Sequence, residues 1–121
     1  MPILDVEVVG TPLPHVRRGL AQRIADETGQ VFQSAPQNTW VKVHFVEPEQ
    51  YAENGGPPGE MLPVFVNVIQ AEHPPANELA AQVALLTAAV ARACHRSDDC
   101  IHVLYDPPAA GRIAFGGRLR L

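Results

Sequence analysis

The chain has 121 residues, of which 46% are hydrophobic and 18% are charged, and its formal net charge is −4. A chain of this length and composition is expected to fold as a single domain, residues 1–121, that buries roughly two-thirds of its unfolded surface. Lys and Arg form no run longer than Arg17-Arg18, so the sequence argues against a nucleic-acid partner.

The two cysteines, Cys94 and Cys100, are too few for a disulfide framework, and the sequence has no paired C-x-x-C spacing of a metal site. We therefore expect two free thiols in a reducing compartment and no bound metal. No apolar run approaches the roughly 18 residues that cross a bilayer, and no basic segment precedes an apolar core at the start of the chain. The expected location is the cytoplasm, without a membrane partner.

The first stretch, Met1-Pro2-Ile3 and onward to Val9, places a proline directly before a predicted strand. A small second residue permits removal of Met1, which would leave the secondary amine of Pro2 at the end of the chain. A free α-amino group titrates near pH 8, and burial lowers that pKa, so a buried Pro2 nitrogen would suit a general base at neutral pH. A purely structural interpretation is also open, because proline is tolerated at the first position of a strand.

The next elements are a helix and a second strand. Apolar residues at Val16, Leu20 and Ile24, and again at 31–32, have helical spacing along one face, and a loop with two prolines precedes them. Residues 39–46 then alternate, with Val41, Val43 and Phe45 on one side, which predicts a strand. A strand, a helix and a strand within about fifty residues are typical of a right-handed crossover with parallel strands.

After a turn-rich joint at 47–59, too rich in proline for regular structure in its second half, the pattern restarts. Residues 62–69 predict a strand, and a helix is expected from about Asn77, which would cap it. Its apolar face would include Leu79, Val83, Leu86, Val90 and Cys94. Residues 97–99 would end this helix, and 100–106 predict another strand.

The two halves match at an offset of sixty residues, so that 41–48 align with 101–108, and Val6 and Val8 with Val66 and Val68. We interpret this as an internal duplication with pseudo-repeats 1–56 and 62–121. The expected fold is α+β: two βαβ units forming a four-stranded mixed sheet with two helices on one face. The other face, with Asp5, Glu7, Trp40, Lys42 and either His102 or Val103, would then be covered in a symmetric ring of subunits.

Three segments in this order resemble the tautomerase superfamily, the family of 4-oxalocrotonate tautomerase and macrophage migration inhibitory factor. They are Met1-Pro2-Ile3, the strand 41–46 with the segment 47–50 and Gly55-Gly56, and the C-terminal stretch from Ile101 to Gly116-Gly117. In this resemblance each half ends in a Gly-Gly hairpin. The segments span nearly the whole chain, although each is short.

The resemblance implies a homotrimer in which Pro2 lies at the floor of a pocket between neighbouring subunits and needs no cofactor. Pro2 would move a proton between an enol and the adjacent carbon of a small anionic substrate, a 2-hydroxyalkenoate or an enolpyruvate. The equivalents of Pro2 in the second half, Leu62 or Pro63, cannot act, because an internal proline nitrogen is an amide. The resemblance thus implies an isomerase with one site per chain.

The substrate-binding candidates are Arg112, Ile69, His102, Lys42, Ile113 and Phe115. Arg112 would clamp a carboxylate from the last hairpin, beside Ile113 and Phe115. Ile69 matches an isoleucine whose backbone amide faces the family's pocket, and Lys42 and His102 fall where 4-oxalocrotonate tautomerase has a strand arginine. Each of the three polar candidates also has a structural interpretation, as a solvated hairpin side chain or as a strand residue satisfying a neighbour. Trp40 and Tyr105 are expected to pack rather than react.

The sequence departs from the family at other pocket positions. The loop arginine of 4-oxalocrotonate tautomerase falls near Thr11-Pro12, and the lysine, tyrosine and asparagine of macrophage migration inhibitory factor fall near Pro36 and on Ile101 and Val103. Two alternatives to an isomerase therefore stay open. One is a hydratase, decarboxylase or dehalogenase, the last disfavoured because residues 70–73 contain no arginine. The other is a ligand-binding module with little turnover.

Overall fold

The computed structural model describes residues 1–56 and 59–121. Its strands are β1 (Ile3–Val9), β2 (Trp40–Val46), β3 (Val64–Ile69), β4 (Ile101–Tyr105), β5 (Ile113–Phe115) and β6 (Arg118–Arg120). Its helices are α1 (Pro14–Arg17), α2 (Leu20–Val31) and α3 (Ala76–Cys94), with short 3₁₀ turns η1 (Pro48–Gln50) and η2 (Asp98–Cys100). Within the described ranges, no helix is long and apolar enough to cross a membrane.

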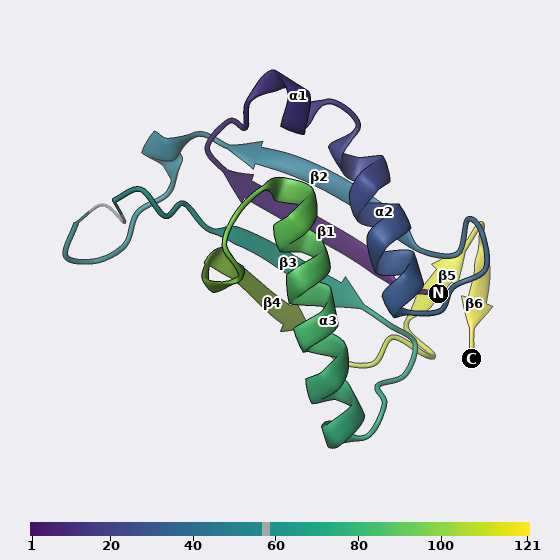
Figure 1. The fold of residues 1–121 in the computed structure, drawn as a ribbon. Coiled ribbons are helices and arrows are strands. Elements are labelled where there is room, and N and C mark those ends of the chain that lie inside the picture. Colours follow the sequence, from purple (N-terminus) through teal and green to yellow (C-terminus); the bar gives the residue numbers. More distant parts are fainter. Residues whose placement is uncertain (57–58) are drawn as a thin grey trace.

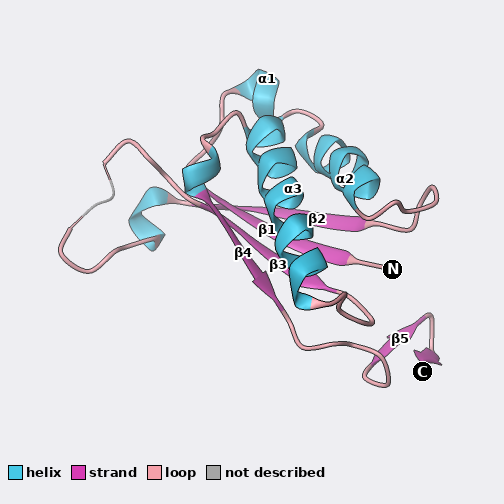
Figure 2. Ribbon diagram, turned by 60° about the horizontal axis from the view of Figure 1, so that its bottom comes forward, coloured by secondary structure: helices cyan, strands magenta, loops and turns pink. Residues whose placement is uncertain are grey.

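Four strands form one mixed sheet in the order β2-β1-β3-β4, and β5 and β6 form a separate hairpin. The pairs β1–β2 and β3–β4 are parallel, and the central pair β1–β3 is antiparallel. Both long helices, α2 and α3, lie across the same face of the sheet (Figure 1). The view in Figure 2 shows the opposite face without a helix. The α+β fold predicted from the sequence is therefore confirmed.

The two parallel pairs share one register when the chain is shifted by sixty residues. Leu4 pairs with Val41 in the first half, and Val64 pairs with Ile101 in the second. The central pairing places Val6 opposite Val66, so a pseudo-two-fold axis relates the two units. The pairing is therefore equivalent in the two halves, and the duplication into 1–56 and 62–121 stays a prediction.

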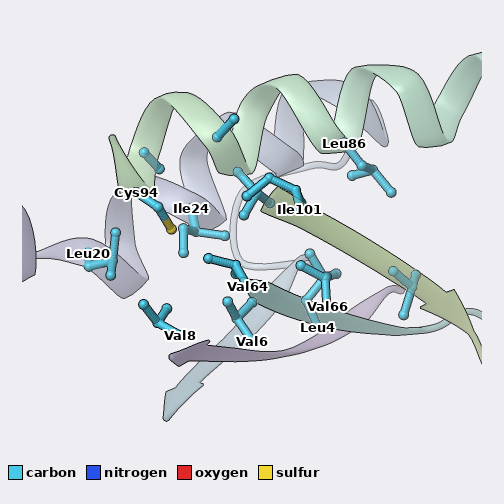
Figure 3. Packing of buried hydrophobic residues seen from close by; sticks show 14 residues of the cluster. Leu4, Val6, Val8, Leu20, Ile24, Val64, Val66, Leu86, Cys94 and Ile101 are labelled. Atoms are coloured by element: carbon cyan, nitrogen blue, oxygen red, sulfur yellow. The ribbon is translucent and has the colours of Figure 1, made fainter. Parts of the chain in front are cut away.

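The core lies between the sheet and the helices. Alternate residues of the central strands, Leu4, Val6 and Val8 with Val64, Val66 and Val68, are completely buried there. They pack against Leu20 and Ile24 of α2 and against Leu86, Val90 and Cys94 of α3 (Figure 3). Burying one such aliphatic side chain contributes roughly 1.5–3 kcal/mol, so this double layer fixes the direction in which each strand presents its other side chains.

The first helix is broken, although the sequence predicts one continuous helix from Val16. Gly19 adopts φ +68°, a left-handed conformation, and separates α1 from α2. The guanidinium of Arg23 spans the break by donating hydrogen bonds to the carbonyls of Val16 and Arg18. Val16, Leu20 and Ile24 still reach the core as predicted.

The ends of α3 also differ from the expectation. Asn77 lies inside the helix, because Ala76 is its first residue and Pro75 occupies the cap position without a side-chain hydrogen bond. The helix ends at Cys94, where His95 turns into the left-handed conformation with φ +54°. Ser97 instead caps η2 by accepting a hydrogen bond from the Asp99 backbone at 3.3 Å.

Only the second of the two expected Gly-Gly hairpins is present in the described part of the chain. Gly116 and Gly117, both with positive φ, connect β5 to β6. Gly55 and Gly56 form a turn that no paired strands flank. Part of the proline-rich joint, residues 57–58, lies outside the described residues.

The face of the sheet without helices carries polar and apolar side chains together. Trp40 is 43% exposed and Leu104 is 61% exposed on this face. His102 is exposed, whereas Val103 packs against the core, so His102 is the member of that pair on the open face.

Candidate functional site

The amino-terminal strand places Pro2 inside the molecule. Pro2 is buried, and its carbonyl accepts a hydrogen bond from the Trp40 backbone at 3.1 Å, which ties the start of β1 to β2. Met1 is 42% exposed. The chain end is therefore held by the sheet up to the residue that would carry the free amine.

Two cavities meet at this chain end, with volumes of about 440 Å³ and about 210 Å³. Pro2 lines the larger cavity, and both Met1 and Ala71 line both cavities. Met1 thus lies between the two spaces. Its removal would uncover the Pro2 nitrogen and open the two cavities toward each other.

The smaller cavity is mainly apolar and brings together three residues singled out from the sequence. These are Ile69 at the end of β3 and Ile113 and Phe115 on β5. The ring of Phe115 contacts that of Trp40 edge to face, with centroids 5.4 Å apart. This contact fixes the hairpin against the start of β2 and so places its side chains beside the chain end.

Arg120 is the cation of the smaller cavity, and it was not among the residues singled out from the sequence. In the β5–β6 hairpin Ile113 pairs with Arg120 and Phe115 pairs with Arg118. Directly paired residues of an antiparallel ladder share one face. The signal was present in the sequence, because a two-residue Gly-Gly loop fixes this register.

Arg112 lies outside the lining of both cavities. Its Nε donates to the carbonyl of Pro108 at 3.1 Å, and its Nη2 donates to that of Pro107 at 2.9 Å. In this arrangement the guanidinium holds the loop that leads into the hairpin.

Lys42 and His102 lie on the open face of the sheet, away from both cavities. Lys42 on β2 forms an ion pair with Asp5 at 3.3 Å. His102 on β4 stacks obliquely on Phe65, with ring centroids 5.6 Å apart. Because β2 and β4 are the two edge strands of the sheet, the structure does not bring these two residues together within one chain.

The larger cavity is lined by polar side chains from three parts of the chain. They come from the segment after α2, from the segment after β3 and from α3: Gln33, Ser34, Asn38, Gln70, Glu72 and Gln82. A groove of about 710 Å³ between α2 and β2 shares Gln33 and Ser34 with it but does not include Pro2. The larger cavity, called the Pro2 cavity below, therefore offers hydrogen-bonding groups, and the smaller cavity, which shares Met1 with it, is mainly apolar.

Two residues that line the larger cavity, Gln70 and Gln82, belong to one hydrogen-bonded cluster with Tyr105. The hydroxyl of Tyr105 donates to Oε1 of Gln82 at 2.8 Å, and Nε2 of Gln70 donates to the same oxygen at 3.3 Å. Burial raises the pKa of Tyr105 to about 12, so the phenol keeps its proton throughout the neutral range. From the sequence, Tyr105 was expected to pack, and Gln82 was not singled out. Nothing in helical spacing alone distinguishes that glutamine from a solvated one.

Several solved structures share the architecture of this chain. A fused 4-OT, a wild-type symmetric trimer, matches with a TM-score of 0.79 at 13% identity, covering 98% of this chain and 94% of that one. Malonate semialdehyde decarboxylase matches with a TM-score of 0.70 at 17% identity, covering 94% of this chain and 90% of that one. Macrophage migration inhibitory factor of Toxoplasma gondii matches with a TM-score of 0.72 at 13% identity, covering 97% of this chain and 98% of that one. No protein-family model and no curated protein sequence matches the chain.

These likenesses extend over nearly the full length of each chain. The chain therefore has the fold of the tautomerase superfamily, as its sequence motifs predicted. At identities of 13 to 17% the likeness defines the fold and leaves the reaction to be argued from the residues of the site.

Proposed function

We propose that this protein is a cofactor-independent tautomerase that uses Pro2 as its general base after Met1 has been removed. The observation that carries the proposal is the place of Pro2: buried, anchored through its carbonyl, and lining a cavity of about 440 Å³. The proposed substrate is a small enol or keto acid, a 2-hydroxyalkenoate or an enolpyruvate. The superfamily fold supports this proposal because it includes enzymes with an anionic keto-acid-like substrate, as the name malonate semialdehyde decarboxylase indicates.

The reaction needs one group that accepts a proton and returns it nearby. In the proposed reaction the neutral Pro2 nitrogen takes the enol O–H proton and the carbonyl forms. The C=C electron pair then takes a proton from the prolinium at the adjacent carbon, which regenerates the neutral amine. No atom or electron is gained or lost overall. A pKa close to the working pH serves both halves of this cycle.

The smaller cavity supplies a place for the rest of the substrate. The apolar side chains of Ile69, Ile113 and Phe115 would contact its hydrocarbon part, and Arg120 would bind its carboxylate. Arg112, Lys42 and His102 remain candidates for carboxylate binding only if a neighbouring subunit brings them to the site, because within one chain they lie elsewhere.

A homotrimer is part of the proposal. The open sheet face exposes Leu104 and Trp40 beside the Asp5–Lys42 pair, and a face of this kind is normally covered by other subunits. The fused 4-OT matched above is itself a trimer. A cytoplasmic location, expected from the sequence, also stays a proposal.

The test is ketonisation of phenylenolpyruvate and of 2-hydroxymuconate by the purified protein, after mass spectrometry has measured the fraction without Met1. Pro2→Ala is expected to lower kcat/KM by at least about 100-fold, the usual contribution of a positioned acid or base. Turnover that is unchanged in Pro2→Ala would exclude Pro2 as the base. Absence of turnover in fully processed protein would favour the binding-module alternative.

A hydratase or decarboxylase is the second candidate, and Glu72 is the observation that favours it. Its carboxylate lines the same cavity as Pro2, where it could activate water while a protonated Pro2 acts as the acid. Malonate semialdehyde decarboxylase, which shares the fold, has both decarboxylase and hydratase activities. Release of CO₂ from malonate semialdehyde, abolished in Glu72→Gln, would support this candidate, whereas ketonisation that survives Glu72→Gln would support the tautomerase.

A further inference from the structure

The structure points to Gln82 as a substrate-binding residue of the Pro2 cavity. We propose that its side-chain amide donates a hydrogen bond to the oxygen of a 2-oxo acid or of its enolate, with Tyr105 and Gln70 as positioning residues behind it. The inference rests on the proposed function for the identity of the ligand. It goes further by assigning a donor on α3 that neither the sequence motifs nor the apolar cavity supplies.

The Gln82 amide is held in one direction. Both hydrogen bonds that Gln82 makes in the described part of the chain end on its Oε1, one from Tyr105 at 2.8 Å and one from Gln70 at 3.3 Å. An amide has one oxygen that accepts and one nitrogen with two donor protons. Within the described residues its two N–H groups have no hydrogen-bond partner, and Gln82 lines the larger cavity together with Pro2.

The support behind Gln82 is rigid. Burial raises the pKa of Tyr105 to about 12, so its hydroxyl keeps the proton that it donates to Gln82 Oε1. The Tyr105 ring contacts the ring of His73 edge to face, with centroids 5.7 Å apart. Gln82 therefore stands on a helix with its acceptor fixed by two neighbours, as a preorganised donor requires.

The chemistry of the reaction calls for a donor of this kind. Moving a proton away from carbon or from an enol oxygen leaves negative charge on that oxygen, and a fixed donor lowers the energy of this state. A neutral amide suits a half-buried position beside a basic amine, because a cation there would favour loss of the proton from prolinium and would cost more to desolvate. The cationic side chain of the site, Arg120, lines the other cavity, where a carboxylate would lie.

The experiment compares three variants with the processed wild type and with the control Gln22→Leu, which replaces an exposed helical glutamine that donates to Asp26. Gln82→Glu keeps an oxygen acceptor for Tyr105 and Gln70 but removes the amide donor, so it retains the support and loses the proposed function. Gln82→Leu removes both the oxygen acceptor and the amide donor. Tyr105→Phe keeps the amide and removes only the group that orients it. Thermal unfolding of each variant verifies that it is folded.

Two readouts separate this inference from the proposed reaction. Calorimetric titration with phenylglyoxylate, a 2-oxo acid without a hydrogen next to its carbonyl, measures binding without turnover, and phenylenolpyruvate ketonisation measures kcat/KM. Gln82→Glu and Gln82→Leu are each expected to lose roughly 10- to 100-fold in both, the range for a hydrogen bond to a charged group. Tyr105→Phe is expected to lose roughly 3- to 10-fold, and its effect should vanish in the Gln82→Leu background.

Binding of phenylglyoxylate by Gln82→Glu as tight as by the wild type would overturn the inference, because only a structural role would survive that change. Absence of phenylglyoxylate binding by the wild type would overturn it as well. If the wild type binds phenylglyoxylate through Gln82 but turns over no enol, the inference stands and the proposed tautomerase reaction falls.

Discussion

At the scale of single residues, the site depends on where the side chains of its arginines are held. Arg112 and Arg120 belong to the same C-terminal segment, yet Arg112 donates to two loop carbonyls outside both cavities, while Arg120, which donates to the carbonyl of Leu121, lines a cavity next to Met1. The sequence alone could identify a hairpin arginine as a carboxylate clamp, but it does not show which arginine lies at a cavity. Pro2, Ile69, Ile113 and Phe115 were singled out through the superfamily resemblance, and they line the two cavities at the chain end.

Arg120→Ala is therefore expected to raise KM for phenylenolpyruvate roughly 10-fold or more, since a hydrogen bond to a charged group contributes about 1.5–3 kcal/mol. Arg112→Ala, the matched control, is expected to change KM less and to lower the melting temperature by loosening its loop. Steady-state kinetics on both variants decides between them. The reverse order of effects would make Arg112 the clamp, supplied in that case across a subunit boundary.

Cys94 provides a test of the core at the same scale. Burial raises the pKa of its thiol to about 11 from an ordinary value of 9.0, so at pH 9 only about 1% is thiolate instead of half. Iodoacetamide should therefore label Cys94 at pH 9 at least tenfold more slowly in the folded protein than in urea, as measured by peptide mass spectrometry. Equal rates in the two states would mean that the α3 end of the core is open to solvent.

At the scale of elements, hydrophobic periodicity identified the strands and long helices but not the places where helices end. The expected continuous helix fails at Gly19, because a left-handed residue cannot continue a right-handed helix. The caps of α3 were missed for a similar reason: Asn77 suits a cap, yet the proline before Ala76 already starts the helix. These boundaries depend on backbone dihedral angles, which periodicity does not report.

Two glycines of this helical segment give a matched prediction. Gly19→Ala is expected to destabilise the protein by about 1–2 kcal/mol, because the backbone of an alanine is strained in the left-handed region. Steric contact is not the cause, since the added Cβ would lie 3.6 Å from Arg23 Nη1, an ordinary van der Waals distance. Gly29→Ala lies within α2, and its Cβ would meet Thr39 Oγ1 at 3.9 Å, an ordinary contact. It is expected to stabilise by about 0.5–1 kcal/mol.

Urea unfolding at one fixed protein concentration measures both changes. If Gly19→Ala were as stable as the wild type, the break between α1 and α2 would not need a left-handed residue. A continuous helix through residues 14–31 would then be the better description.

At the scale of the whole molecule, the sequence motifs predicted the fold, and the internal duplication stays a prediction. Leu4 with Val41 and Val64 with Ile101 occupy equivalent places in the two units, so one βαβ pattern explains both halves. The pocket at Pro2 was expected only through the superfamily resemblance, because the cavities at the chain end arise where β3, the hairpin and the amino terminus meet. These segments are far apart in the chain.

The open sheet face gives the prediction for assembly. Leu104→Glu places a charge on this face and is expected to reduce the mass in solution from about three times 13.1 kDa to that of one chain. Leu85→Glu is the matched control, because Leu85 is 57% exposed on α3, close to the 61% of Leu104. Sedimentation analysis at micromolar concentration makes the comparison. A trimer that persists in Leu104→Glu, or a monomeric wild type, would contradict assembly through this face.

The two ends of the chain lie at the same end of the sheet, beside the hairpin (Figure 1). Met1 and Arg120 line one cavity, so a purification tag fused to either terminus would start at the edge of the proposed active site. A tag before Met1 would also prevent the maturation on which the amine depends. Kinetic work on this protein thus calls for tagless material with a verified first residue, and specific activity should scale with the processed fraction of each preparation.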